Sequence, residues 1–499
     1  MKTRKFFVLP AVCCALALTL GACGEEKQEN AKAEAEAKGK AKLIFSEDGK
    51  TLTGVKYKGI KPVVIPNGVT SIGEGAFFFC SSLKSITIPD SVTSIGDGAF
   101  RCVQSVQVST KNPVFSVDGS GVLINKKEKK LLHAPRSLSG NYTIPDSVTS
   151  IERWAFEGCS SLKSITIPDS VTSIGEWAFS DCDNLTSITI GNGVTSIGAG
   201  AFSDCSSLKS ITIPDSVTSI GRHAFSGCSS LTSITIPDSV TSIGDGAFSG
   251  VQTVQVSTKN PVFSVDGSGV LINKKEKKLR YAPPGLSGNY TIPDSVTSIG
   301  GGAFRGCKNL TSITIPDNVT SIERYAFSDC YSLTSITIPD NVTSIGDGAF
   351  SGCKNLTSIT IPSGVKSIEA RAFFGCKNLT SITIPDSVTS IGWEAFSHCS
   401  ELTSITIPDS VTRIGNGAFS RCSSLTSITI PYKVTSIGNR AFSGCSSLSG
   451  ITIGNRVKSI GRDAFSGCSS LKSITIPSRF TDEDVKKWAV PSNCEVIRR

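Results

Sequence analysis

The sequence predicts an α/β-type solenoid, an elongated fold in which similar coils stack on one another. The first reason is that phenylalanine recurs every 23 residues, interrupted twice by an interval of 56 residues. A fixed period of this length indicates one supersecondary unit per repeat, which buries its apolar face only against its neighbours. The second reason is that the residues around each phenylalanine recur with it, so equivalent side chains are expected to stack in columns. The in-phase phenylalanines are Phe77, Phe100, Phe156, Phe179, Phe202, Phe225, Phe248, Phe304, Phe327, Phe350, Phe373, Phe396, Phe419, Phe442 and Phe465.

The first half of each coil is predicted to be a β-strand. In the coil from Leu208 to Cys228 (LKSITIPDSVTSIGRHAFSGC), Ile211 and Ile213 alternate with serine and threonine, which is the period-2 pattern of a half-buried strand. Pro214 follows and ends the strand, because proline cannot donate to the next ladder bond. Equivalent strands of successive coils are therefore expected to pair in a parallel sheet on one face.

The second half of each coil is expected to form turns on the other face. The Asp-Ser pair after the proline suits a turn, and residues 217–220 read as a second short extended piece. Ala224, Phe225 and Cys228 have the spacing of one helical turn that buries a single face. No such coil is stable alone, because both of its flat sides are apolar.

Two longer units, at 104–151 and 252–299, break the period and are near-copies of each other. Both contain VFSVDGSGVLINKKEKKL, in which an Asp-Gly turn and a lysine-rich turn separate β-like runs, so each is predicted to carry a protruding hairpin. The KKEKK tips, 126–130 and 274–278, are expected to be exposed. Docking to an anionic partner and simple solubilisation of a loop tip both fit this composition.

Caps are expected at both ends of the solenoid, which is predicted to span 65–477, because open ends would expose apolar coils. At one end, 43–64 begins with LIFSEDGKTLTGV, a predicted capping hairpin around Asp48-Gly49. At the other end, 478–499 holds three acidic residues after Thr481, the pattern of an N-capped helix that covers the last coil.

The N-terminal residues 1–22 are predicted to be a lipoprotein signal peptide. Basic residues precede an apolar stretch that is short for a transmembrane span, and the stretch ends in LGAC at Cys23. This ending resembles the bacterial lipobox, which implies lipidation of Cys23 and anchoring through several acyl chains. An ordinary secretory leader with a chance cysteine is the alternative. Residues 23–42, rich in Ala, Glu and Lys, are expected to form a tether, and the chain to be membrane-anchored at the outer membrane or cell surface.

The composition argues against nucleic-acid binding and catalysis. The net charge of +9 is spread over the chain, whereas nucleic-acid binding calls for clustered lysine and arginine. The three histidines, His133, His223 and His398, lie near no periodic acid or nucleophile, and no catalytic or nucleotide-binding motif is present. We therefore expect no enzymatic activity and no cofactor.

The cysteines are predicted to form a buried column of free thiols. An exported chain with many cysteines favours disulfides or a metal site, but here one cysteine follows the phenylalanine of most coils by three residues. Parallel side chains about 5 Å apart seldom reach the torsion of a disulfide, although bridges between adjacent coils stay an alternative. No histidine or CxxC partner accompanies them, so no metal site is expected. The column is Cys80, Cys159, Cys182, Cys205, Cys228, Cys307, Cys330, Cys353, Cys376, Cys399, Cys422, Cys445 and Cys468.

The most variable positions of the coils lie just before each Ala-Phe pair. Three of the four tryptophans fall there, with tyrosine, histidine and several arginines. Such residues dominate the binding energy of interfaces, whereas drift of an unconstrained surface row or partial burial would explain them equally well. The candidate ligand-binding residues are Arg153, Trp154, Trp177, Arg222, His223, Arg324, Tyr325, Arg371, Trp393 and Arg440.

The coil pattern L-x-x-I-x-I-P-x-x-V-x-x-I-G-x-x-A-F-x-x-C resembles the BspA-like class of leucine-rich repeats. The resemblance implies leucine-rich repeat coils and a surface adhesin, with partners among proteins or glycans of the host matrix or of other bacteria. A structural surface coat or immune decoy without a specific ligand would have the same fold. A lattice that binds ice or another crystal is a third hypothesis, because the strand face is a regular carpet of serine and threonine.

Overall fold

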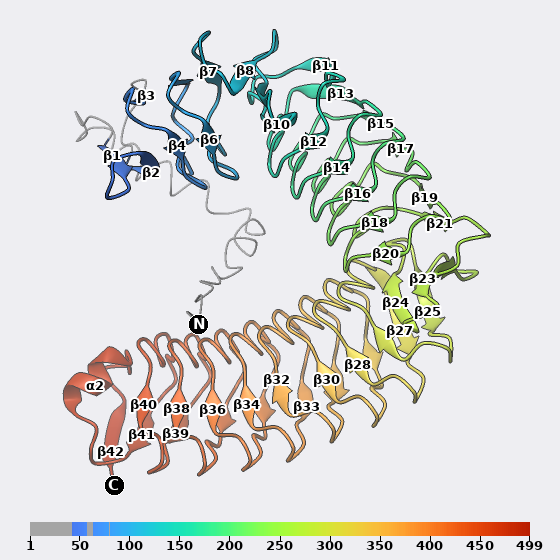
Figure 1. The fold of residues 1–499 in the computed structure, drawn as a ribbon. Helices are drawn as coiled ribbons and strands as arrows, with labels where there is room; N and C mark the ends of the chain where they lie inside the picture. The colour runs from blue at the N-terminus through green and yellow to red at the C-terminus, as the bar shows by residue number, and fades with distance from the viewer. Residues whose placement is uncertain (1–41, 57–62, 79) are drawn as a thin grey trace, which may run out of the picture. The chain divides into compact units, whose positions relative to one another are not determined.

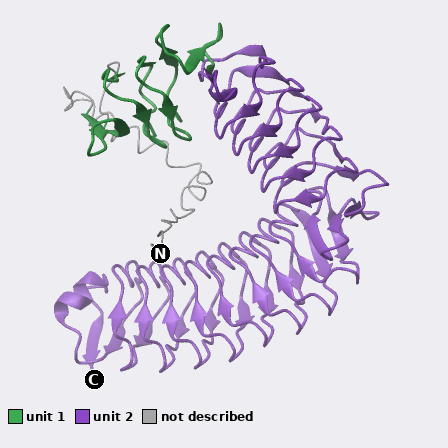
Figure 2. Cartoon of the chain, in the orientation of Figure 1, with its two compact units in different colours: residues 1–123 green, residues 124–499 purple. Residues whose placement is uncertain are grey.

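The computed structural model describes residues 42–56, 63–78 and 80–499. The chain divides into two compact units, residues 1–123 (unit 1) and 124–499 (unit 2), coloured separately in Figure 2 and each described by itself below. The predicted signal peptide, Cys23 and all but the last residue of the predicted tether lie outside the described residues. In the part of the chain that is described, no helix combines the length and apolarity needed to span a bilayer.

Each regular coil contributes two short strands, which build two separate parallel ladders (Figure 1). In the first ladder Ser164 pairs with Ser187 of the next coil, and in the second Ser173 pairs with Ser196. The register repeats because a slip by one residue would turn the buried isoleucines to solvent. The predicted parallel sheet is therefore present, and the second extended piece forms a ladder of its own.

The strands follow in chain order, at two per regular coil. In unit 1 they are β1 (Lys42–Phe45), β2 (Thr51–Lys56), β3 (Val63–Val64), β4 (Ser71–Ile72), β5 (Ile86–Ile88), β6 (Ser94–Ile95), β7 (Val106–Val108) and β8 (Phe115–Val117), followed by β9 (Leu123–Asn125). In unit 2 up to the second long unit they are β10 (Lys130–His133), β11 (Gly140–Thr143), β12 (Ser150–Ile151), β13 (Leu162–Ile167), β14 (Ser173–Ile174), β15 (Ser187–Ile190), β16 (Ser196–Ile197), β17 (Ser210–Ile211), β18 (Ser219–Ile220), β19 (Ile234–Ile236) and β20 (Ser242–Ile243). The second long unit holds β21 (Val254–Val256), β22 (Phe263–Val265), β23 (Leu271–Asn273), β24 (Lys278–Tyr281), β25 (Ser287–Thr291) and β26 (Ser298–Ile299). The remaining strands are β27 (Asn309–Thr314), β28 (Ser321–Ile322), β29 (Ser335–Ile336), β30 (Ser344–Ile345), β31 (Ser358–Thr360), β32 (Ser367–Ile368), β33 (Ser381–Thr383), β34 (Ser390–Ile391), β35 (Ser404–Ile405), β36 (Arg413–Ile414), β37 (Ser427–Ile428), β38 (Ser436–Ile437), β39 (Gly450–Thr452), β40 (Ser459–Ile460), β41 (Ser473–Ile476) and β42 (Glu495–Arg498).

The prediction of a helical turn in each coil, and with it the α/β class, is corrected: the described chain is a β-solenoid. The segment around each Ala-Phe pair consists of hydrogen-bonded turns, in which the Ala224 N–H donates to the Gly221 carbonyl at 3.3 Å. A helix cannot continue there because the backbone takes positive φ on both sides of the phenylalanine, 55° at His223 and 76° at Gly227. Among the described residues the α-helix is α2 (Asp482–Lys487).

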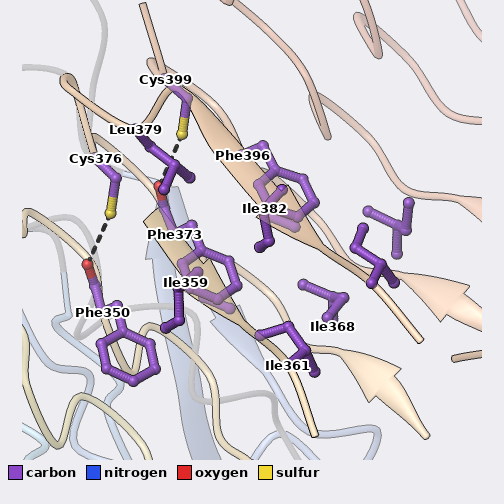
Figure 3. Packing of buried hydrophobic residues seen from close by; sticks show 14 of the residues in the cluster. Phe350, Ile359, Ile361, Ile368, Phe373, Cys376, Leu379, Ile382, Phe396 and Cys399 are labelled. Atoms are coloured by element: carbon purple, nitrogen blue, oxygen red, sulfur yellow. Dashed lines mark hydrogen bonds between the residues drawn. The ribbon is translucent and has the colours of Figure 1, made fainter. Parts of the chain in front are cut away.

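The core is a stack of phenylalanine rings that runs through consecutive coils. In unit 2, the ring centroid of Phe373 lies 5.5 Å from that of Phe350 and 5.4 Å from that of Phe396, with interplanar angles of 4° (Figure 3). Unit 1 has the same arrangement at Phe77 and Phe100, with centroids 5.6 Å apart. Parallel, offset rings at this spacing attract each other beyond the area that they bury.

The cysteine column lies beside the ring stack, and its thiols are hydrogen-bond donors. Cys376 Sγ lies 3.2 Å from the carbonyl oxygen of Phe350, and Cys399 Sγ lies 3.2 Å from that of Phe373 (Figure 3). Burial raises the pKa of these thiols, to about 12 for Cys422. The thiols of Cys376 and Cys399 therefore stay protonated. Each adds a second donor to a buried carbonyl that already accepts a backbone N–H, from Cys353 at 3.1 Å for Phe350 and from Cys376 at 3.2 Å for Phe373.

The long unit 252–299 interrupts both columns. Its strands β22, β23 and β24 pair antiparallel, as the predicted hairpin requires. The buried Asn260 side chain makes hydrogen bonds to four backbone groups at the base of this hairpin and so holds it against the preceding coil. Lys274 to Lys277 are exposed as expected. Lys278 is not: its side chain is 13% exposed, and its Nζ lies 2.6 Å from Glu323 Oε1.

Both ends of the described chain carry a cap. In unit 1, β1 and β2 form an antiparallel hairpin with Asp48-Gly49 in its turn. In unit 2, Thr481 caps α2, since its side chain accepts from the Asp484 N–H and the Asp484 carboxylate accepts in return. Trp488 directly after the helix is 2% exposed and packs edge-on against Phe480 at 5.0 Å between ring centroids. The last coil is thereby closed to water.

Candidate binding row

The candidate binding residues form two adjacent rows that differ in backbone conformation. We call the third residue before each in-phase phenylalanine the outer row and the second residue before it the inner row. The outer-row candidates are Arg153, Arg222, Arg324 and Trp393, and the inner-row candidates are Trp154, Trp177, His223, Tyr325, Arg371 and Arg440. The sequence pattern predicts a single surface made of both rows, whereas in the structure the two rows differ in backbone conformation and exposure.

Every inner-row candidate has a left-handed backbone, with φ between 54° and 60°. A non-glycine residue in this region is strained by roughly 1–2 kcal/mol, and it persists only where the surrounding structure holds it. Other coils have glycine at the same position, among them Gly200, Gly246 and Gly348, also with positive φ. The alternation of glycine with large residues was the sequence pattern that could have predicted this conformation.

Several inner-row side chains lie across the glycine of the next coil. A Cβ atom added to Gly200 would lie 2.4 Å from the ring of Trp177, and one added to Gly348 would lie 2.3 Å from the ring of Tyr325. At Gly246 the same atom would lie 2.7 Å from the ring of His223. These rings therefore pack on the solenoid itself, in space that only a glycine leaves open.

Four arginines of the two rows, Arg153, Arg324, Arg371 and Arg440, pair with acids one coil further on. Arg371 Nε lies 2.7 Å from Glu394 Oε2, and Arg153 Nε lies 3.3 Å from Glu176 Oε2. The outer-row Arg324 lies 3.4 Å from Asp347, with both side chains at the surface. Exposed pairs of this kind contribute at most about 1 kcal/mol each. Their effect is to hold each of these guanidinium groups against the following coil.

Two guanidinium groups also stack on tryptophan rings. Arg153 lies 3.8 Å from the ring centroid of Trp154, and Arg371 lies 4.0 Å from that of Trp393. Trp393 is 43% exposed and belongs to the outer row, whereas Trp154 and Trp177 are half-buried. A stacked cation holds the exposed indole in one orientation, which makes Trp393 the best-presented aromatic side chain of the row.

The electrostatics of the row favour neutral histidine. Burial lowers the pKa of His223, and the neighbouring Arg222 charge lowers it further. His398 lies outside both rows, two residues after its phenylalanine, and burial followed by Arg421 lowers its pKa as well. Among the described residues no group of three or more His, Cys, Asp and Glu side chains is arranged to hold a metal ion.

The predicted binding residues lie in adjacent rows in the structure, but they differ in exposure to solvent. The exposed candidates are Arg222, Arg324, Trp393 and Arg440, and the half-buried ones are Arg153, Trp154, Trp177, His223, Tyr325 and Arg371. Sequence reasoning missed the acids that organise the arginines, which are Glu176, Asp347, Glu394 and Asp463. Their position one coil after each arginine was visible as a pairing pattern in the repeats.

Comparison with known proteins supports this architecture. The BspA type leucine-rich repeat region matches 55–121, 136–255, 287–403 and 389–489. A leucine-rich repeat protein from Eubacterium ventriosum is 26% identical over 74% of this chain and 97% of its own, with a TM-score of 0.55. A search of curated sequences returned no significant match.

Two further solved structures align over more of the chain with lower structural agreement. A leucine-rich cell surface protein from Faecalibacterium prausnitzii is 26% identical over 91% of this chain and 97% of its own, with a TM-score of 0.39. A leucine-rich repeat protein from Bacteroides ovatus is 27% identical over 93% of this chain and 99% of its own, with a TM-score of 0.32. The repeat match covers most of the described coils, and the chain therefore belongs to the BspA-type leucine-rich repeat family.

Proposed function

We propose that the chain is a lipid-anchored surface protein, an adhesin whose solenoid binds macromolecules of the host matrix or of other bacteria. Family membership supports a binding scaffold, since a solenoid offers an extended surface rather than a closed pocket. The observation that carries the proposal is the exposed outer row, where Arg371 stacks on the exposed Trp393 and where Arg222 and Arg324 are also exposed. Many weak contacts on such a row add up through multivalency.

The binding experiment compares two faces of the same coils. The purified full chain is first tested by pull-down against matrix proteins, glycans and bacterial envelopes. A variant with Arg222, Arg324 and Trp393 changed to alanine removes exposed outer-row side chains, and we expect its affinity for any captured ligand to fall at least about 30-fold, the equivalent of one interface hot spot of about 2 kcal/mol. Its melting temperature is expected to stay unchanged, because these side chains lie at the surface.

A matched control changes the same number of residues on the strand face. Thr337, Thr360 and Thr383 are exposed on adjacent coils, and their replacement by alanine leaves the outer row intact. Lost binding in this control, with full binding in the outer-row variant, would move the site to the Ser/Thr face. Failure of the whole panel to bind would favour the surface-coat or immune-decoy hypothesis.

The membrane anchor has its own test. We propose lipidation of Cys23, on the basis of the lipobox resemblance. Cys23→Ser is expected to leave the leader uncleaved or to release the protein from membranes, as followed by detergent partitioning. Unchanged partitioning in this variant would contradict lipidation and would leave the binding proposal for the solenoid untouched.

A further inference from the structure

The turn that follows each strand of the first ladder carries a line of exposed acids. In most regular coils this turn has the sequence Asp-Ser or Asp-Asn before the buried valine. The serine side chain holds the turn, as Ser216 Oγ does by donating to the Val194 carbonyl at 2.7 Å. The aspartates project to solvent, and those of unit 2 are Asp146, Asp169, Asp215, Asp238, Asp294, Asp317, Asp340, Asp386 and Asp409. We call this line the aspartate edge.

The last three coils lack the acids of this edge and carry cations one residue further on, at the position that serine holds in the other turns. Their turns read Tyr432-Lys433, Asn455-Arg456 and Ser478-Arg479, and all six residues are exposed. Tyr432 is 55% exposed, with the Lys433 amino group 5.8 Å and the Arg456 guanidinium 5.2 Å from its ring centroid. We call the three basic residues, Lys433, Arg456 and Arg479, the cationic edge.

The nearby acidic residues of the same chain form ion pairs with arginines outside the cationic edge. Asp463 pairs with Arg440 and Arg462 on the binding row, and Asp482 pairs with Arg498. Of the cationic edge, Arg479 alone repeats the structural task of the serine, donating to the Asn455 carbonyl at 2.8 Å and to that of Val457. Turn geometry therefore does not account for Lys433 and Arg456, because serine suffices in the equivalent turns.

The two edges repeat with the same spacing. The cationic edge follows β37, β39 and β41, which are consecutive strands of one parallel ladder. Asp294, Asp317 and Asp340 follow β25, β27 and β29, which are also consecutive. Each step is one inter-strand distance of about 4.8 Å. Asp294, Asp317 and Asp340 are the one run of three aspartates in successive coils within unit 2. Elsewhere the aspartate edge is interrupted, by Asn192 and by Ser363.

We propose that this edge of unit 2 binds the same edge of a second copy of the chain, antiparallel across a twofold axis. Lys433, Arg456 and Arg479 then face Asp340, Asp317 and Asp294 of the second copy. Symmetry repeats the contact at the other end, so that six ion pairs form at once, as an isologous interface requires. The strands that precede these turns follow one another on one side of unit 2, since β25, β27, β29, β31 and β33 form one ladder and β35, β37, β39 and β41 continue it in the next (Figure 1). Both contacts therefore lie along one edge.

The residues between the two contacts fit this register. In the antiparallel alignment Ser363 lies opposite Asp409 of the second copy. Between Asp294 and Asp409, the turn with Ser363 is the one that has no aspartate at this position. Asp386 lies on the axis and faces its own copy, which is the one like-charge contact. An edge that carried aspartate in every coil would meet two further repulsions here. The exception at Ser363 thus has a physical reason in the dimer.

The association is tested on the purified full chain by sedimentation velocity. Because the pairs are exposed, we expect dimers at about 50 mM NaCl and monomers at about 500 mM NaCl. Lys433→Ser with Arg456→Ser restores the residues of the other coils and should weaken dimerisation at least about tenfold without altering the melting temperature. Ser363→Asp should weaken it, and Asp386→Ser should strengthen it.

Charge reversal identifies the contact partner. A variant with Lys433→Glu and Arg456→Glu should fail to dimerise alone, as should one with Asp317→Lys and Asp340→Lys, whereas their mixture should form a heterodimer. A monomer at all salt concentrations overturns the proposal, as does a dimer indifferent to these changes. Binding of the cationic edge to an added polyanion such as heparin, with no self-association in its absence, also overturns it.

Discussion

The regular coils of unit 2 and its long unit at 252–299 pack aromatic rings in different ways. Between Phe304 and Phe465, neighbouring rings lie 5.1–5.7 Å apart and within 10° of parallel. At the long unit, Tyr281 meets Phe248 edge-on at 6.2 Å, and Tyr290 meets Phe304 at 56°. The rings of the regular coils stack in parallel because adjacent coils have the same backbone and the same side-chain conformation, so each ring has the same orientation as the next.

Where the period breaks, hydrogen bonds replace stacking. Tyr281 Oη donates to the Val251 carbonyl at 2.6 Å, and Tyr290 Oη donates to the Asp266 carboxylate at 2.6 Å. The last coil before the long unit has Val251 in place of the in-phase cysteine, so the thiol column stops there too. A phenylalanine or cysteine is therefore stabilised in its column by the same residue in the adjacent coils. Four predictions test this dependence.

The largest effect is expected at alkaline pH, where the thiol column loses its protons. Folding raises the pKa of Cys228, Cys307, Cys422 and Cys468 from 9.0 to about 12 by burial. The folded chain therefore holds protons that the unfolded chain releases, so stability is complete below pH 9.0 and is lost as the pH rises toward 12, by up to about 4 kcal/mol per thiol. Circular dichroism of the full chain should show cooperative unfolding in this window.

A cysteine variant separates this effect from the titration of other groups. Replacing Cys228 and Cys422 by valine, the residue found at 251, should make the loss of stability with pH shallower even though each lost donor lowers stability at neutral pH. Thiolate absorbance that rises while the circular dichroism stays native would contradict the buried thiol column.

The second effect is the removal of one ring from the stack. Phe373→Ala deletes a fully buried ring with parallel neighbours on both sides, at a cost of about 3–5 kcal/mol. Tyr281→Phe keeps a ring in the long unit but loses the bond to Val251, at a cost of about 1–2 kcal/mol. Chemical denaturation measures both. A larger cost for Tyr281→Phe would mean that the hydroxyl, not the ring stack, dominates.

The third effect concerns the glycines beneath the inner row. Gly200→Ala places a Cβ against the Trp177 ring at a residue with φ of 61°, and we expect a loss of about 2 kcal/mol or more. Gly302, which follows the long unit, has φ of 66° and its nearest neighbour at 3.8 Å, so Gly302→Ala should cost only about 1 kcal/mol. In a Trp177→Ala background the two glycine changes should become equal, and persistent inequality would disprove the packing.

The smallest effect is the pH response of His223. Its pKa is lowered by burial and by Arg222, with Arg305 and Arg324 acting in the same direction and Asp245 against them. The unfolded chain then binds more protons, so this contribution to stability is present above pH 6.5 and is lost as the pH falls below it. His223→Gln should flatten the fall in melting temperature between about pH 7 and about pH 5. An unchanged pH profile would show that His223 is not the titrating group.

Much of the candidate row could be predicted because variability stands out against repetition. Trp393, Arg222 and Arg324 were predicted from the variability of their positions and from residue type, and the structure places them at the surface. Trp154 and Trp177 were grouped with Trp393, although they lie one position later in the coil. One residue decides whether an indole points to solvent or lies across the next glycine, because the inner-row backbone is left-handed.

The sequence by itself determined the coil length, the columns and the register of this protein. Near-identical coils bury their isoleucines, phenylalanines and cysteines only when they stack in register. The position of a residue within the repeat therefore already predicts whether its side chain is buried. Tertiary structure alone decided the backbone of the turn around each phenylalanine, where a helix was predicted. At Gly227 and His223 the chain takes positive φ so that each coil can close and hydrogen-bond to the next, as Phe225 N–H does to the Ala247 carbonyl at 2.7 Å. That choice depends on the neighbouring coil, which no single repeat contains.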